Sequence, residues 1–203
     1  MFYATDQHHG LKHNPFKSLV VPRPIGWVST VSTEGVRNLA PFSYFNALAT
    51  DPPVVVFGCN GAHAEGGVKD SLDNTRATGE FVVNIATWEL KDQMNTTSAQ
   101  VGRGVDEFAE AGLTPAPATL VKAPRVAESP VNLECRLLQI LDLPSRDPAQ
   151  PNSAVLGQVV GIHIEDAIVR DGMIDMTRFR PIARLGYMDY TVVDTVFTMG
   201  RPG

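Results

Sequence analysis

Residues 22–46 read PRPIGWVSTVSTEGVRNLAPFSYFN, and this stretch carries the strongest indication of the fold. Residues 27–32 are rich in aromatic and β-branched side chains, which predicts a strand. Residues 36–40 form the return strand after a turn at Glu34-Gly35. Alternation along the first strand places Trp27 and Val28 on opposite faces. We expect Pro41 to break the second strand, because proline lacks a backbone N–H.

The end of this stretch combines flat rings with hydrogen-bonding groups. Residues 42–46 interleave three aromatic side chains with Ser43 and Asn46 in an expected loop. Such a loop could supply core residues, or it could hold a planar ligand between apolar walls and polar groups. Arg23 lies between Pro22 and Pro24, which stiffen the chain before the first strand.

Further strands are predicted at residues 54–59, 81–85, 132–143, 155–164 and 190–193, and short helices at residues 69–76, 87–98 and 106–111. Gly79 is expected to end the first helix, and Gly157 and Gly161 to mark bulges. Strands dominate and hairpins recur. The pattern therefore favours a mainly β fold, an antiparallel β-barrel with flanking helices, over a doubly wound α/β sheet.

The predicted helix at residues 69–76 begins with Lys69, Asp70 and Ser71. Free N–H groups at a helix N-terminus, beside a lysine and a serine, form a suitable phosphate-binding site. The alternative is an ordinary exposed helix that Asp70 or Ser71 caps.

Composition excludes several classes of protein. The 203 residues include 43% hydrophobic and 19% charged side chains, with a formal net charge of −5, so neither nucleic-acid binding nor membrane-surface binding is indicated. The longest apolar run, residues 54–59, is too short to span a bilayer, and residues 1–10 lack the layout of a signal peptide. Cys59 and Cys135 form no CxxC motif, which favours two reduced core thiols in a cytoplasmic protein.

Common catalytic and cofactor motifs are absent: no GxGxxG, Walker A, G-x-S-x-G or paired-cysteine metal motif occurs. His8, His9 and His13 could bind a metal, but a solvated N-terminal arm is favoured and no metal is predicted. His63, in a glycine-containing loop, is a weak catalytic candidate. His163 lies in a strand pattern and is expected to be structural.

Six motifs, in this order, resemble the flavin reductase-like family of FMN-binding split barrels, in its conserved flavoprotein branch. They are RPIGWVST at 23–30, NLAPFSYFN at 38–46, KDS at 69–71, TGEFVVN at 78–84, ESP at 128–130 and RPIARLG at 180–186. The resemblance covers residues 18–195, leaving an N-terminal arm (1–17) and a C-terminal tail (196–203).

The resemblance implies a six-stranded Greek-key split barrel that acts as a homodimer and binds FMN. It also implies hydride transfer from NAD(P)H to flavin, and onward transfer to a small molecule or a protein. Because the flavin supplies this chemistry, no protein nucleophile is required. Two alternatives remain: a non-catalytic FMN protein for electron relay or storage, and an enzyme of pyridoxamine-phosphate-oxidase type on a related barrel.

The resemblance also implies roles for individual residues. Ser29 and Thr30 would follow the ribityl-phosphate chain, residues 40–46 would contact the isoalloxazine, and Lys69 with Ser71 would bind the phosphate. Tyr187 stands where a second glycine is expected after Gly186. The implied flavin contacts are Arg23, Ser29, Thr30, Ala40, Pro41, Phe42, Ser43, Tyr44, Asn46, Lys69, Ser71, Asn74 and Arg184.

Overall fold

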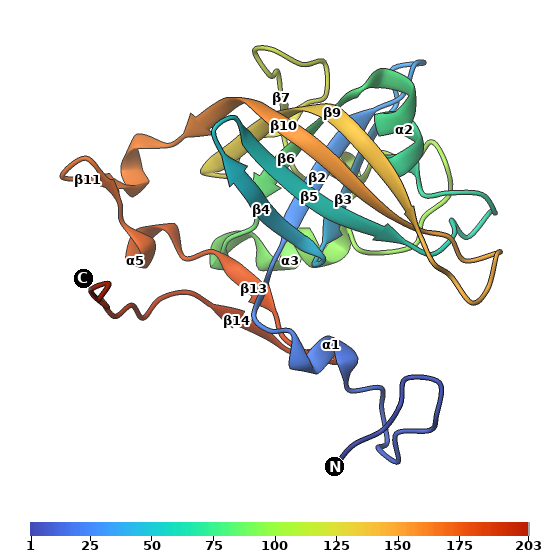
Figure 1. Cartoon of the computed structure of the whole chain (residues 1–203). Helices are drawn as coiled ribbons and strands as arrows, with labels where there is room; N and C mark the ends of the chain where they lie inside the picture. Colours follow the sequence, from blue (N-terminus) through green and yellow to red (C-terminus); the bar gives the residue numbers. More distant parts are fainter. Residues whose placement is uncertain (203) are drawn as a thin grey trace.

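The computed structural model describes residues 1–202 and contains one large antiparallel sheet that curls into a barrel (Figure 1). Its seven strands lie in the order β3-β2-β6-β9-β10-β5-β4, one strand more than the resemblance implied. Their bounds are β2 Gly26–Val31, β3 Arg37–Phe42, β4 Phe45–Thr50, β5 Pro53–Asn60, β6 Glu80–Ile85, β9 Val131–Leu143 and β10 Asn152–Ile164.

Helices and short strands surround this sheet. The helices are α1 Phe16–Leu19, α2 Asp70–Thr78, η1 Trp88–Leu90, α3 Lys91–Thr96, α4 Glu107–Glu110, η2 Asp166–Ile168 and α5 Met176–Phe179. The short strands are β1 Arg23–Pro24, β7 Pro115–Ala116, β8 Arg125–Val126, β11 Val169–Arg170, β12 Met173–Ile174, β13 Ile182–Arg184 and β14 Tyr190–Val192. No helix in the described part of the chain is long and apolar enough to cross a membrane.

The expected alternation along β2 is confirmed, and it divides the core in two. Val28 packs inside the barrel with Phe57 and Phe81, whose ring centroids are 5.3 Å apart. Trp27 faces the opposite side and packs among η1, α3 and α4, where its Nε1 donates to Thr97 Oγ1 at 2.9 Å. Because both faces of β2 are buried, this strand fixes the barrel and the helical layer together.

Two expectations for the region after β2 are wrong. Pro41 does not break the second strand but pairs with Trp27 within β3. β3 is an edge strand with β2 on one side only, which is where a sheet tolerates proline. In addition, Phe42 belongs to β3, and Phe45 and Asn46 belong to β4 rather than to a loop, so only Ser43 and Tyr44 separate the two strands.

The expected bulges in β10 are present. The pairing of β10 with β9 shifts register at Gly157 and at Gly161. A Cβ on Gly157 would lie 2.3 Å from the ring of Phe81, so this position requires glycine for close packing.

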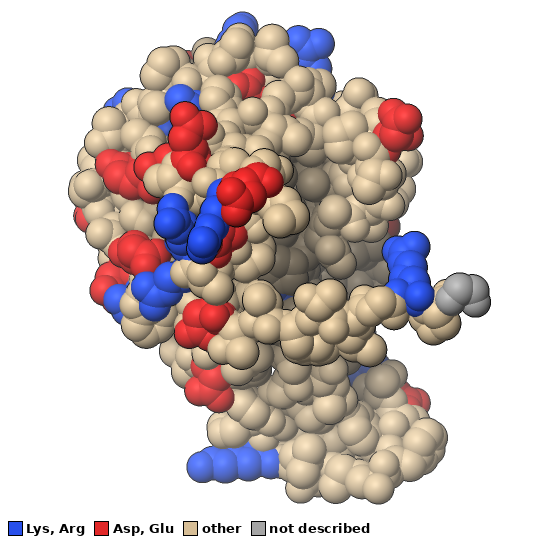
Figure 2. Space-filling view, turned by 90° about the vertical axis from the view of Figure 1, so that its left-hand side faces the viewer, with Lys and Arg blue, Asp and Glu red and all other residues tan. Residues whose placement is uncertain are grey.

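A separate three-stranded sheet, β1-β13-β14, lies below the barrel next to α1 (Figure 1). The β13–β14 hairpin packs closely on α1, since a Cβ on Gly186 would lie 1.8 Å from Ser18 Oγ. Several apolar side chains of these terminal segments are exposed, among them Phe16, Leu19 and Met188. Figure 2 shows that charged side chains gather on the barrel, while the lower part of this face is largely uncharged.

Candidate functional site

The N-terminus of α2 presents unused hydrogen-bond donors. The first backbone bonds of the helix are donated by Leu72 and Asp73, both to the carbonyl of Lys69. Among the described residues, the N–H groups of Asp70 and Ser71 have no acceptor, and the Lys69 ammonium has no ion pair or hydrogen bond. Lys69 occupies the N-cap position without a side-chain cap, so the predicted capping by Asp70 or Ser71 is wrong. This end of the helix is therefore free to bind an anion.

A buried polar network supports the start of α2. Ser71 Oγ donates to Asn38 Oδ1 at 2.7 Å, and Asn38 Nδ2 donates to Glu107 Oε1 at 2.8 Å. The second oxygen of Glu107 accepts the Leu39 N–H at 3.0 Å. Burial raises the pKa of the Glu107 carboxyl, although these hydrogen bonds oppose the shift. The network ties β3, α2 and α4 to one another.

His63 and Arg103 hold the other side of the same helix end. Arg103 donates to the Asp70 carboxylate and to the carbonyls of Gly66 and Val68. The His63 Nδ1 accepts the Glu65 N–H at 3.1 Å, so its Nε2 carries a proton and faces Asp70 Oδ2 at 3.6 Å. These contacts fix the loop that precedes α2.

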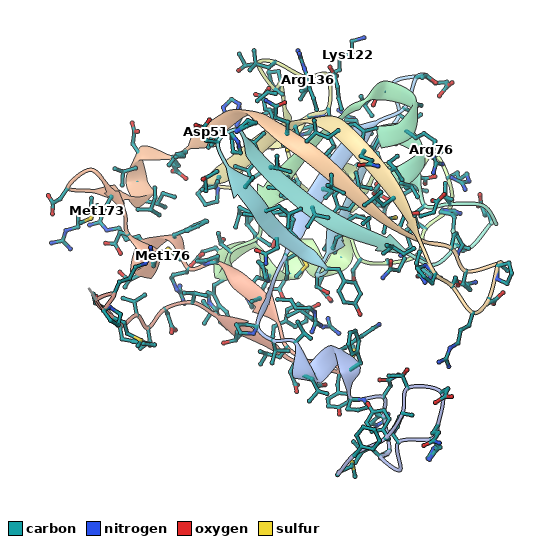
Figure 3. All side chains as sticks on the ribbon, viewed as in Figure 1. Asp51, Arg76, Lys122, Arg136, Met173 and Met176 are labelled. Atoms are coloured by element: carbon teal, nitrogen blue, oxygen red, sulfur yellow. The ribbon has the colours of Figure 1, made fainter. Side chains whose placement is uncertain are left out.

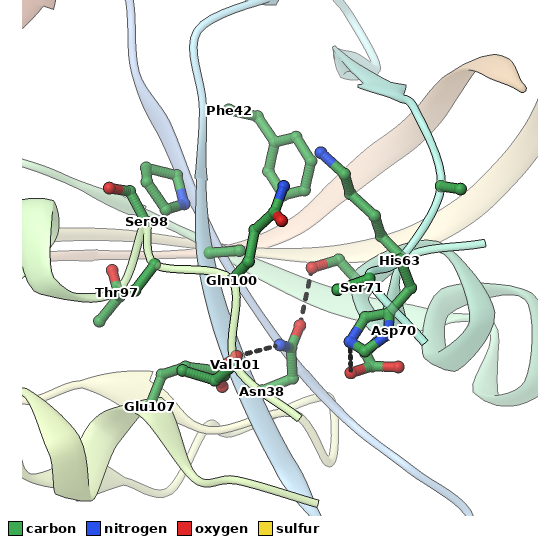
Figure 4. Close-up of a pocket in the computed structure, with 16 residues that line it drawn as sticks. Asn38, Phe42, His63, Asp70, Ser71, Thr97, Ser98, Gln100, Val101 and Glu107 are labelled. Carbon is green, nitrogen blue, oxygen red and sulfur yellow. Dashed lines mark hydrogen bonds and ion pairs between the residues drawn. The ribbon is translucent and has the colours of Figure 1, made fainter. Parts of the chain in front are cut away.

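These groups surround a cavity of about 170 Å³, which we call the first cavity. Figure 4 shows Ser71 and His63 on one side of it and Thr97 and Ser98 on the other, with Asn38 between them. It is lined by Asn38, Ala40, Pro41, Phe42, Ala62, His63, Ala64, Lys69, Asp70, Ser71, Thr97, Ser98, Ala99, Gln100, Val101 and Glu107.

A second cavity of about 510 Å³ adjoins the first, because Pro41 and Ser98 line both. We call the two cavities together the groove, because their linings follow residues 40–44 from α2 to the β13–β14 hairpin. The second cavity is lined by Asn14, Lys17, Arg23, Ile25, Pro41, Ser43, Tyr44, Met94, Asn95, Ser98, Arg184, Tyr187, Met188 and Tyr190.

Nine of the thirteen predicted flavin contacts line this groove, and the structure thereby brings them together. Those at the first cavity are Ala40, Phe42, Lys69 and Ser71, Pro41 lines both cavities, and those at the second are Arg23, Ser43, Tyr44 and Arg184.

The two arginines of the second cavity are already engaged with the protein. Arg23 is 6% exposed and donates to the carbonyls of Lys17, Val20 and Leu185. Arg184 donates to the Tyr190 hydroxyl and to the Tyr187 carbonyl. Both guanidinium groups therefore fix the sheet below the barrel while contributing positive charge to the cavity wall.

The other four predicted contacts are not brought to the groove. Ser29 and Thr30 are fully buried, and the Ser29 hydroxyl donates to the Pro124 carbonyl. Asn74 donates to Thr30 Oγ1 at 3.0 Å and belongs to the lining of neither cavity. Asn46 lies on β4 and accepts the N–H of Ala47 at 2.9 Å. These hydroxyls and amides stabilise the fold in the described chain.

Sequence reasoning missed several residues that line the groove. Asn38 and Glu107 are 69 positions apart and meet only because α4 packs on β3. The only local indication for Glu107 was its position directly after Asp106, the residue that caps α4. Tyr190 belonged to a predicted strand, and nothing in the sequence indicated that it would face Arg184 at 4.4 Å.

Comparison with known proteins places this architecture in a family. The family model described as "Flavin reductase like domain" matches residues 18–183. An uncharacterized protein of Aquifex aeolicus is 39% identical over 169 residues, covering 83% of each chain.

Two solved structures are similar over nearly their whole length. Nitrilotriacetate monooxygenase component B from Bacillus cereus has a TM-score of 0.88 and 28% identity, covering 98% of both chains. The 2-nitrobenzoate 2-nitroreductase NbaA of Pseudomonas fluorescens has a TM-score of 0.84 and 25% identity, covering 100% of this chain and 96% of that one. The chain therefore belongs to the flavin reductase-like domain family.

Proposed function

We propose that this protein is an FMN-binding oxidoreductase of flavin reductase type that uses NAD(P)H. The observation that carries the proposal is the groove itself. At one end it offers Lys69 and the first α2 N–H groups, which have no partner in the described part of the chain, and at the other it widens beside Ser43 and Tyr44. A phosphorylated molecule with a flat ring needs an anion-binding group at one end of its site and a wider, partly apolar space at the other.

The residues present fit FMN. Lys69 and the N–H groups of Asp70 and Ser71 would bind the phosphate, whose charge they complement. The Ser71 hydroxyl already donates its proton to Asn38, so its role is to position the helix end. Phe42 and Tyr44 would supply apolar surface to the ring, and Ser43 a hydrogen bond to its edge. When bound, FMN supplies acceptance of a hydride from NAD(P)H and its onward transfer to an acceptor.

His63 remains a candidate for a proton-handling role, because it lines the first cavity. Its Nδ1 is committed to the Glu65 N–H, and its protonated Nε2 faces Asp70. This arrangement also holds the ring at the mouth of the phosphate site. A His63→Gln variant would separate the two roles, since a positioning role alone predicts weaker FMN binding without a changed pH profile of turnover.

We further propose that the protein is a homodimer in the cytoplasm. The exposed apolar residues of α1 and of the C-terminal tail, such as Phe16, Leu19 and Phe197, support a partner surface. The two buried, unpaired cysteines, Cys59 and Cys135, support a reducing compartment. Sedimentation equilibrium tests the dimer directly, and a monomer at micromolar concentration would contradict it.

The function is tested by absorbance spectroscopy of the purified protein with added FMN. We expect a bound flavin spectrum that bleaches on anaerobic addition of NADH or NADPH. Protein that stays colourless after FMN addition contradicts flavin binding altogether. Bound flavin that neither nucleotide bleaches would instead support the alternative, an FMN protein for electron relay or storage.

A further inference from the structure

The second cavity has a chemistry distinct from that of the proposed phosphate site. It lies between the barrel and the small sheet below it, and its volume of about 510 Å³ is in the range of small-molecule binding sites. It joins the first cavity at Pro41 and Ser98. Ser43 and Tyr44, the proposed contacts of the FMN ring, line part of the second cavity, whereas Lys17, Tyr187 and Tyr190 line the part formed by α1 and the β13–β14 hairpin, so a ligand bound against these three residues would lie next to the ring.

The charge of this cavity is positive. Lys17, Arg23 and Arg184 line it, and no carboxylate belongs to its lining, although the chain as a whole has a net charge of −5. Among the described residues, the Lys17 ammonium has no ion pair and no hydrogen bond, whereas both arginines are engaged. Lys17 is therefore the cation available to an anionic ligand.

The walls of the cavity are aromatic as well as cationic. Arg23 lies over the ring of Tyr44 at 5.7 Å, and Arg184 lies over the ring of Tyr190 at 4.4 Å. Tyr187 adds a third ring, which is 51% exposed. Stacked guanidinium and phenol planes offer flat surfaces on which another planar group can pack.

The backbone of Tyr187 has a conformation that is unfavourable for a residue other than glycine. Its φ is +53°, in the left-handed region that favours glycine. Arg184 donates to its carbonyl, and the ring of His13 lies 5.6 Å from its ring. A tyrosine held in this conformation at a cavity wall indicates that its ring has a role in the cavity.

We propose that the part of the second cavity lined by Lys17, Tyr187 and Tyr190 binds a small planar aromatic anion, such as an aromatic carboxylate, as the second substrate of the flavin site. Its ring packs against Tyr187 and Tyr190, and its anionic group pairs with Lys17. The assignment as a substrate rests on the proposed function, whereas the binding itself does not.

Calorimetric titration with 2-naphthoate and its neutral isostere 2-naphthamide tests the proposal, on both FMN-loaded and flavin-free protein. We expect 2-naphthoate to bind about tenfold more tightly than 2-naphthamide, because only the acid pairs with Lys17. Lys17→Ala should abolish this preference. Tyr187→Gly should weaken both ligands about fivefold or more.

Lys122→Ala is the matched control, since it removes the same charge at an exposed site on the far side of the barrel (Figure 3). It should leave both affinities within about twofold of wild type. Equal binding of acid and amide, or wild-type affinity in both Lys17→Ala and Tyr187→Gly, would overturn the proposal. If FMN fails to bind while the flavin-free protein still shows the predicted pattern, the proposed function fails and the aromatic-anion site stands.

Discussion

At the α2 end of the groove, Asn38, Ser71 and Glu107 are at most 7% exposed and hydrogen-bonded to one another, whereas at the hairpin end Tyr187 and Met188 are 51% and 82% exposed. The first end is built on strands and helices of the barrel. The second is built on a separate three-stranded sheet and a one-turn helix.

A single fold can thus combine a rigid site with one whose side chains can vary. At the α2 end, a buried hydrogen-bond network holds the side chains in one arrangement, which suits binding of an invariant phosphate. The hairpin end can change its side chains without disturbing the barrel, which suits a variable second ligand.

We expect the greatest loss of stability from a substitution at the α2 end. Glu107→Ala would leave the side-chain amide of Asn38 and the backbone N–H of Leu39 buried without an acceptor. We expect this to lower the free energy of unfolding by about 3 kcal/mol. Urea denaturation measures this cost. Glu110→Ala, at an exposed position of the same helix, should change stability by less than about 0.5 kcal/mol. Equal effects of the two substitutions would mean that the network does not stabilise this end.

A substitution at the hairpin end should cost less. Gly186→Ala would place a Cβ 1.8 Å from Ser18 Oγ and 2.8 Å from its Cα, so α1 must move away from the hairpin. We expect a loss of about 1–3 kcal/mol, together with weaker binding in the second cavity. Gly200→Ala is the control, because its Cβ would meet no atom within 4 Å. An unchanged melting temperature for Gly186→Ala would contradict close packing of α1 on the hairpin.

A third substitution is expected to leave the stability unchanged or to raise it. Tyr187→Gly relieves about 1–2 kcal/mol of left-handed strain. Glycine also has greater conformational freedom in the unfolded chain, which lowers the free energy of unfolding by about 0.5–1 kcal/mol and offsets part of this gain. We therefore expect stability equal to wild type or higher by up to about 1 kcal/mol, together with weaker aromatic-anion binding. A marked loss of stability would show that Tyr187 is retained for packing and not for a ligand.

The smallest effect concerns pH. Burial raises the pKa of Glu107 above its ordinary value of 4.5, so the folded chain binds a proton there more readily than the unfolded chain. This proton uptake stabilises the folded state fully below pH 4.5, and the stabilisation is lost as the pH rises through the raised pKa that Glu107 has in the folded state. The stability of wild type relative to Glu107→Gln should therefore fall from pH 4 to pH 7. A relative stability that rises over this range would contradict the raised pKa.

Much of the barrel was predictable from sequence. Local patterns predicted β2, the C-cap at Gly79 and the bulges at Gly157 and Gly161, because each depends on neighbouring residues. The ordered motifs predicted the family. Pro41 and β4 were misjudged, because only the sheet order shows that β3 is an edge strand and that Phe45 pairs with Phe57.

The candidate site divides in the same way. Lys69 and Ser71 could be predicted from the start of one helix, whereas Ser29 and Thr30 could not be excluded, since their burial depends on Asn74 and the distant Pro124 carbonyl. Lys17, Tyr187 and Tyr190 reach one cavity from opposite ends of the chain. No local pattern encodes that meeting.

If the α2 end of the groove binds the phosphate of FMN, the protein must distinguish FMN from riboflavin, which lacks the phosphate. Quenching of flavin fluorescence gives both affinities for wild type, Lys69→Ala and the control Lys122→Ala. We expect wild type to prefer FMN, Lys69→Ala to reduce this preference about tenfold while riboflavin binding is retained, and Lys122→Ala to change neither affinity. Equal weakening of FMN and riboflavin by Lys69→Ala, or equal affinity of wild type for both, would contradict phosphate binding at this end.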